Sequence, residues 1–221
     1  VIVTGGCMEA ITLALRAVAR PGDTVALESP TYFPLLQIIE GLGLKALEIP
    51  THPRDGMSVD AFELATRRAG AVRAALVMPT FSNPLGSSMP DEAKRRLVEL
   101  CAERDIPLIE DDVHGEIAFD GSRPRPLKAW DTAQNVLLCS SFSKTVAPGL
   151  RIGWIVPGRL QREIELLKLS ATLFTSQLAQ LALAEFVANG GYDHHLRRLR
   201  VTLREQEQRV REAVGQSFPA G

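Results

Sequence analysis

Short apolar runs alternate with segments of helical period along most of the chain. The candidate strands are rich in Val, Ile, Leu and Ala, and they lie at Thr24–Glu28, Lys45–Ile49, Ala74–Met78, Pro107–Glu110, Val136–Cys139 and Ile152–Val156. Runs that are apolar throughout are typical of strands covered on both faces. Helical periodicity appears at Met8–Val18 and at Glu92–Arg104, and Pro90-Asp91 marks the start of the second helix. The alternation predicts a three-layer α/β/α sandwich with a mostly parallel sheet.

The pattern changes after Val156, where the strands cease and residues 159–217 read almost entirely as helix. We therefore expect residues 1–190 to form one large domain and residues 191–221 to form a long helix leading to a C-terminal small domain that the sequence lacks. The chain opens without Met, in a β-branched run (Val1–Thr4) that reads as the end of a strand. These ends lead us to expect an internal, N-terminally truncated piece of a longer protein.

Polar residues follow the predicted strands at the points where they end. They occur in Gly5-Gly6-Cys7, Ser29-Pro30-Thr31-Tyr32, Ser82-Asn83-Pro84, Asp111-Asp112-Val113-His114 and Ser140–Lys144. Ligands of open parallel sheets bind beyond the carboxyl ends of the strands. The five segments therefore predict one shared site.

The segment from Ser140 to Trp154 carries the most specific chemistry. It begins with three hydroxyls and Lys144, and Arg151 follows before another apolar strand. Hydroxyls and a guanidinium suit a phosphate, because arginine offers paired N–H donors that match phosphate oxygens. A lysine that is partly desolvated and near another cation is easier to deprotonate and can form a Schiff base with an aldehyde.

This segment, Ser-x-Ser-Lys-Thr followed by Pro-Gly-Leu-Arg-Ile-Gly-Trp, resembles the lysine loop of fold-type I pyridoxal-5′-phosphate (PLP) enzymes. The resemblance is to class I/II aminotransferases and in particular to the aminotransferase-like domain of MocR-type (GntR family) regulators, and it covers essentially the whole chain. It implies that Lys144 forms the Schiff base with PLP. It also implies that Ser141, Ser143 and Arg151 hold the cofactor phosphate.

Two further segments agree with this resemblance. A glycine turn opens the first predicted helix, where free N–H groups and the helix dipole favour an anion, although most such turns merely reverse the chain. The resemblance implies that Gly6, Cys7 and Met8 bind the phosphate through their backbones. Tyr32 could stack on a flat heteroaromatic ring or pack under a loop, and the resemblance places it against the pyridine face.

The remaining candidates follow the middle strands. Asn83 precedes a proline, which restricts its backbone to extended geometry, and the resemblance implies a hydrogen bond from Asn83 to the phenolic oxygen of PLP. A carboxylate facing the pyridine nitrogen keeps that nitrogen protonated. Glu110, Asp111 and Asp112 compete for this role on chemistry alone, and the family spacing selects Asp111. His114 stands where the family usually has a tyrosine that bonds to the phenolic oxygen. We expect His114 to modulate the pH response of the bound cofactor without being essential for holding it, and the alternative is a histidine that points into solvent.

Three functions compete. The leading one is a transaminase that acts on an amino acid and a 2-oxo acid, with Lys144 as general acid and base. The alternative is the PLP- or effector-sensing domain of a MocR-type regulator, in which a DNA-binding winged helix precedes the domain. In a third, Asp111, Asp112, His114 and Glu116 bind a divalent metal, but this leaves the lysine loop unexplained, so we predict no metal.

Composition adds little to this picture. The 221 residues are 45% hydrophobic, and 25 basic residues against 26 acidic residues give a formal net charge of −1. This balance provides no field that would gather nucleic acid, and no apolar run is long enough to cross a bilayer. The three widely spaced cysteines match neither a disulfide framework nor a metal site. We expect a cytoplasmic protein, a homodimer by the resemblance, and nucleic acid as a partner only if a winged helix precedes Val1.

Overall fold

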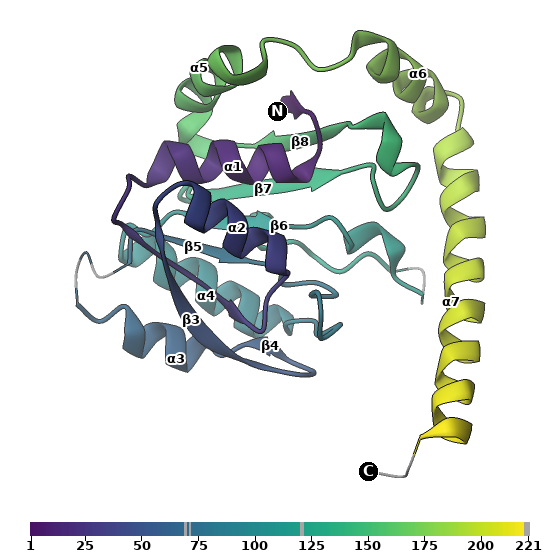
Figure 1. Ribbon diagram of the computed structural model, residues 1–221, viewed down its shortest axis with the longest axis horizontal. Coiled ribbons are helices and arrows are strands. Elements are labelled where there is room, and N and C mark those ends of the chain that lie inside the picture. The colour runs from purple at the N-terminus through teal and green to yellow at the C-terminus, as the bar shows by residue number, and fades with distance from the viewer. Residues whose placement is uncertain (69, 71, 120–121, 219–221) are drawn as a thin grey trace.

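The strands of the computed structural model form one sheet, which helices cover on both faces (Figure 1). The structure describes residues 1–68, 70, 72–119 and 122–218. Along the sheet the strand order is β1-β8-β7-β6-β5-β2-β3-β4. The strands are β1 (Ile2–Thr4), β2 (Thr24–Ser29), β3 (Lys45–His52), β4 (Gly56–Met57), β5 (Ala74–Val77), β6 (Leu108–Asp111), β7 (Val136–Ser141) and β8 (Gly153–Val156).

The strands β3, β2, β5, β6 and β7 run parallel, whereas β1, β8 and β4 pair antiparallel at the flanks. The prediction of a mostly parallel sheet in an α/β/α sandwich is confirmed. Parallel neighbours need crossover connections, and helices supply most of them. All parallel strands consequently end at the same edge of the sheet.

Two apolar clusters, one on each face, hold the layers together. Side chains alternate along a strand, so Val25 and Leu27 enter one cluster while Ala26 enters the other. The first cluster joins the sheet to α1 (Cys7–Val18), α2 (Phe33–Gly41) and α5 (Gln161–Thr172). The second joins it to α3 (Val59–Ala65), α4 (Asp91–Glu103) and the 3-10 turn η2 (Leu127–Trp130). The predicted helices Met8–Val18 and Glu92–Arg104 correspond to α1 and α4.

The predicted burial of both faces is wrong for the run Lys45–Ile49. This run forms most of β3, in which Lys45, Ala46 and Glu48 are exposed and Ile49 is buried. The reason is its position near the edge of the sheet, where the two-residue strand β4 is its outer neighbour. The apolar residues of the run gave no sign of that position.

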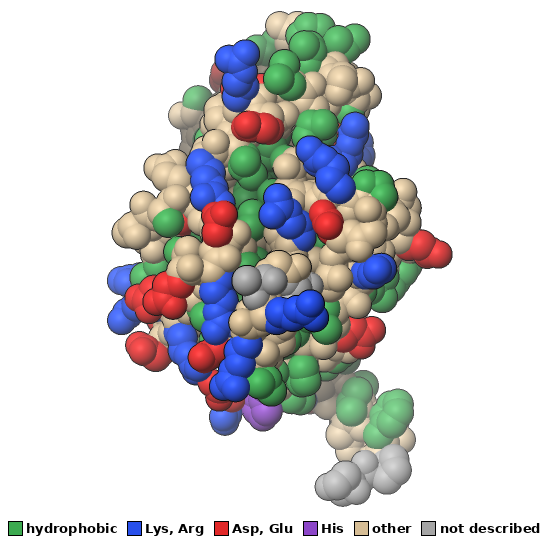
Figure 2. All heavy atoms as spheres, turned by 90° about the vertical axis from the view of Figure 1, so that its left-hand side faces the viewer, with side chains coloured by type: hydrophobic (Ala, Val, Ile, Leu, Met, Phe, Trp, Pro, Cys, Tyr) green, Lys and Arg blue, Asp and Glu red, His purple; other side chains and the backbone are tan. Residues whose placement is uncertain are grey.

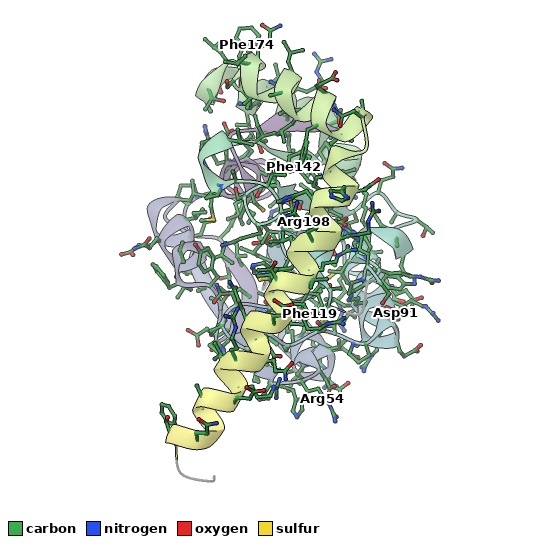
Figure 3. All side chains as sticks on the ribbon, turned by 90° about the vertical axis from the view of Figure 1, so that its right-hand side faces the viewer. Arg54, Asp91, Phe119, Phe142, Phe174 and Arg198 are labelled. Atoms are coloured by element: carbon green, nitrogen blue, oxygen red, sulfur yellow. The ribbon has the colours of Figure 1, made fainter. Side chains whose placement is uncertain are left out.

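The helical stretch after Val156 is confirmed and consists of α5, α6 (Gln177–Ala188) and α7 (Gly191–Ser217). The helix α7 begins at the predicted residue and crosses the face of the molecule where the strands end, beside Phe142 (Figure 3). The last three residues of the predicted segment 191–221 lie outside the described residues. The remaining short turns are η1 (Gly115–Ile117), η3 (Pro148–Leu150) and η4 (Gly158–Leu160).

On the opposite side, basic and acidic side chains are interspersed rather than segregated (Figure 2). This agrees with the nearly balanced composition, because neither sign of charge dominates that face. Within the described part of the chain, no helix has both the length and the apolar character that a bilayer span requires.

Candidate functional site

The segments that follow the strand ends enclose a cavity of about 200 Å³. Its lining contains every residue predicted for the site except Gly6, together with three that the sequence analysis did not propose. The lining residues are Cys7, Met8, Tyr32, Met78, Asn83, Asp111, Val113, His114, Ser141, Ser143, Lys144, Pro148 and Arg151. Met78, Val113 and Pro148 were missed because apolar residues at strand and loop ends carry no chemical signal.

Gly6 lies directly behind the cavity wall, against the guanidinium of Arg151. The Nη2 of Arg151 donates to the carbonyl oxygen of Gly5 at 2.8 Å, and its Nη1 donates to that of Pro148 at 3.3 Å. Gly6 has a φ of +112°, and a Cβ at this position would lie 2.4 Å from Nη2. The absence of a side chain at Gly6 therefore lets the guanidinium reach the start of α1.

This arrangement provides two kinds of donor for an anion. The helix α1 begins at Cys7, so its first N–H groups point out of the helix toward the cavity lined by Cys7 and Met8. The guanidinium of Arg151 adds a fixed positive charge beside them. A phosphate is the anion that matches both sets of donors.

The three adjacent acids of β6 and its end have different surroundings. Asp111 lines the cavity. Glu110 accepts hydrogen bonds from the N–H groups of Leu127 and Lys128, at 2.7 and 3.0 Å. Asp112 forms an ion pair with Arg123. Residue chemistry alone could not decide which of these three acids belongs to the site. The geometry shows that Asp111 lines the cavity.

Asp111 is buried and held by two donors. Its Oδ1 accepts from the thiol of Cys7 at 3.3 Å and from the N–H of Val113 at 3.2 Å. Burial raises the pKa of Asp111 to about 6, although both hydrogen bonds oppose the rise. Burial, followed by the charge of Asp111, raises the pKa of Cys7 well above its ordinary value, so Cys7 remains a protonated donor. A cation placed against Asp111 would favour its charged form.

Lys144 lines the cavity but is exposed, so the expected partial desolvation is wrong for the chain as described. The loop itself is well held: the Oγ of Ser141 accepts from the N–H of Ser143 at 3.3 Å. On the far side of the loop, Nε2 of His195 in α7 lies 2.8 Å from the carbonyl oxygen of Thr145.

Tyr32 and Asn83 lie at the cavity from two other loops. Tyr32 is half-buried at the start of α2, and its ring centroid lies 5.7 Å from that of the exposed Phe33. Asn83 is exposed, and its N–H donates to the Sδ of Met78 at 3.2 Å. The side chain of Asn83 thus remains available to a ligand.

His114 also lines the cavity, and its Nδ1 lies 2.9 Å from the carbonyl oxygen of Phe81. A carbonyl accepts only, so Nδ1 carries the hydrogen. Burial lowers the pKa of His114, with the bond to Phe81 acting in the opposite direction. The imidazole is therefore neutral near pH 7, and its second nitrogen is an acceptor.

The acids proposed for a metal site are engaged elsewhere. Arg123 binds both Asp112 and Glu116, and Arg200 of α7 lies 3.6 Å from Glu116. Among the described residues, no group of three or more His, Cys, Asp or Glu side chains is arranged to hold a metal ion.

The site as a whole fits PLP. The cradle at Gly6 and Arg151 matches a phosphate, the buried Asp111 matches a protonated ring nitrogen, and Lys144 offers an amine at the same cavity. The chain carries these groups after β1, after β6 and between β7 and β8, and the sheet brings them together.

Comparison with known proteins agrees with this chemistry. The sequence profile of the family "Aminotransferase class I and II" matches residues 1–219. The chain is 46% identical to YjiR of Escherichia coli, an uncharacterized HTH-type transcriptional regulator, over 90% of this chain and 42% of YjiR. It is 31% identical to aromatic-amino-acid aminotransferase 1 of Thermococcus litoralis, over all of this chain and 54% of that enzyme.

Among solved structures, the kynurenine aminotransferase of Pyrococcus horikoshii, determined in complex with PMP, superimposes with a TM-score of 0.94. The two are 31% identical, and the match covers all of this chain and 55% of that one. The chain thus spans about half the length of the relatives it matches.

Proposed function

Because the chain belongs to the aminotransferase class I and II family, we propose that its protein transfers an amino group from an amino acid to a 2-oxo acid. The observation that carries this proposal is one cavity lined by Asp111, at the end of β6, and by Lys144 and Arg151, from the segment between β7 and β8. PLP is the implied cofactor, and when bound it supplies an aldehyde carbon and an electron-withdrawing ring.

In this proposal, several residues that line the cavity bind and orient the cofactor. Arg151 and the backbone N–H groups at Gly6, Cys7 and Met8 bind the phosphate, and Ser141 and Ser143 add hydroxyls. Tyr32 stacks on the ring, which restricts the direction in which bonds of the substrate can break.

The proposed chemical roles fall on Asp111 and Lys144. Asp111 would keep the ring nitrogen protonated. The positive charge of that nitrogen favours the carboxylate form of Asp111, and a buried carboxylate is a strong hydrogen-bond acceptor. The Nζ of Lys144 would hold PLP covalently until the amino group of the donor displaces it, and the amine freed in this way would move a proton between the Cα of the substrate and the cofactor carbon. Asn83 donates to the phenolic oxygen.

The chain spans about half the length of the relatives it matches. We infer that residues 1–190 form the large PLP-binding domain and that α7 leads to a small domain. We also infer a homodimer in the cytoplasm. An exposed apolar surface on the segment α5–α6 supports association with a further surface, because Leu173, Phe174 and Leu178 are 61, 86 and 80% exposed.

A second candidate function rests on the 46% identity to the regulator YjiR. In that case the same site senses PLP or an amine, and an HTH segment outside this chain binds DNA. The two candidates share the cofactor site and differ in whether turnover occurs.

The test uses the full-length protein loaded with PLP and mixed with a panel of amino acids and 2-oxo acids. Steady release of the 2-oxo acid derived from the donor supports the transaminase. Spectral change without turnover, together with amine-dependent DNA binding, supports the regulator. A protein that does not retain PLP contradicts both.

A further inference from the structure

Among the described residues that line the cavity, His114 is a polar side chain to which the proposed function gives no task. It stands where the resemblance leads one to expect a tyrosine that donates to the phenolic oxygen of PLP. The structure gives His114 a different partner, since its Nδ1 lies 2.9 Å from the carbonyl oxygen of Phe81. This bond joins the segment after β6 to the loop after β5.

The loop in question carries Asn83, two residues beyond Phe81. Phe81 has a φ of +49°, a left-handed conformation that few residues other than glycine adopt. Such a conformation persists only where surrounding contacts hold it. The orientation of the Phe81 carbonyl therefore depends on the groups that bind it.

Elsewhere this loop is held by its own residues and by Arg54, whose carbonyl oxygen accepts from the N–H of Ser88 at 3.0 Å. The N–H of Phe81 donates to Oγ of Ser88 at 3.1 Å, and the N–H of Ser82 donates to the carbonyl of Ser87 at 2.9 Å. Among the described residues, two further contacts hold the loop to the cavity wall: that of Met78 with Asn83, which involves a weak sulfur acceptor, and that of His114 with Phe81. The bond from His114 is the stronger of these two.

We propose that His114 is a positioning residue whose Nδ1–H, donated to the Phe81 carbonyl, fixes the loop that presents Asn83 to the cavity. His114 then contributes to cofactor binding through the loop and not through a hydrogen bond to the phenolic oxygen. The consequence for the cofactor rests on the proposed function, whereas the bond between His114 and the loop does not.

Two substitutions distinguish the contributions of the two ring nitrogens of His114. The side-chain amide of asparagine has the same reach as Nδ1, whereas that of glutamine has the reach of Nε2. His114→Asn therefore retains the donor to Phe81, and His114→Gln removes it while keeping a polar side chain. His114→Phe removes both nitrogens.

The first measurement is amide hydrogen exchange of Ser82 and Gly86 in the full-length protein without PLP. Both amides are hydrogen-bonded within the loop. We expect His114→Gln and His114→Phe to accelerate exchange about tenfold, the factor for loss of about 1.4 kcal/mol, and His114→Asn to retain the parental rate. The ¹⁵N shifts of the ring should identify the tautomer with hydrogen on Nδ1.

The second measurement is PLP affinity, which should fall about tenfold in His114→Gln and stay at the parental value in His114→Asn. The proposal is overturned if His114→Gln preserves the parental exchange rates, whatever His114→Asn does, or if the ring carries its hydrogen on Nε2. If exchange follows the expected order while PLP affinity is equal in all variants, the contact is upheld and the role of Asn83 in binding the cofactor is refuted.

Discussion

Replacing Gly6 with alanine tests how the site holds a phosphate. Gly6 combines a φ of +112° with a Cβ position only 2.4 Å from Nη2 of Arg151. The new methyl group must therefore displace the guanidinium from the carbonyl of Gly5, to which Nη2 donates at 2.8 Å. The substitution changes no charge and removes no donor, so its effect on binding reports on the placement of Arg151.

Two contributions to the effect can be separated. Backbone strain at a φ that suits glycine costs about 1–3 kcal/mol of stability. Displacement of Arg151 removes up to two charge-assisted hydrogen bonds to the phosphate, each worth about 1.5–3 kcal/mol. The expected loss of PLP affinity is therefore about 100-fold to 10,000-fold.

Gly22→Ala is the matched control for the strain. Gly22 also has a positive φ, +93°, but a Cβ there would meet open space among the described residues. We expect Gly22→Ala to lose a similar amount of stability in denaturant unfolding and to keep its PLP affinity.

The assay is fluorescence titration of the PLP-free protein with PLP, in the Gly6 and Gly22 variants and in an Arg151→Gln background. In that background Gly6→Ala should lose most of its effect on PLP affinity, because the guanidinium that the new methyl group would displace is absent. The reasoning is refuted if Gly6→Ala binds PLP as tightly as Gly22→Ala, or if its effect is undiminished when Arg151 is absent.

The other predictions concern the buried acids. Asp111→Ala should slow the reaction with an amino donor in rapid-mixing kinetics by two or more orders of magnitude, far more than Asp112→Ala, since a charge at the ring acts on the chemical step. Equal losses in the two variants would show that Asp111 is not the acid at the ring nitrogen. Burial raises the pKa of Glu28 and of Glu110 to about 8. The folded state therefore holds protons that the unfolded state has released, so the free energy of unfolding should fall as pH rises from about 4.5, the ordinary pKa, to about 8, by up to about 1.4 kcal/mol per pH unit and group. Urea unfolding of the PLP-free protein checks this, and a flat profile, or one unchanged by Glu28→Gln, would contradict it.

The fold was largely predictable because its signals are local. Apolar runs and helical periods lie in sequence order, and β2, β5, β6, β7 and β8 match predicted runs within about two residues. The exposed β3 was not predictable, because a strand's position in the sheet depends on which strands pair with it.

The site likewise has a part that the sequence could predict and a part that it could not. Polar residues at the ends of parallel strands converge by topology, so the sequence could anticipate that Asp111 and Lys144 line one cavity. The partners of individual side chains could not be anticipated. The contact of Cys7 with Asp111 spans 104 positions, and that of His114 with Phe81 depends on the shape of a loop.

The central claim is that Lys144 holds PLP covalently, and borohydride reduction followed by peptide mapping tests it most directly. Reduction of the full-length protein loaded with PLP should abolish its visible absorption band and leave one pyridoxyl group, on the peptide that contains Lys144. Lys144→Ala should lack the band before reduction. A pyridoxyl group on another peptide, or a band that persists in Lys144→Ala, would contradict the account.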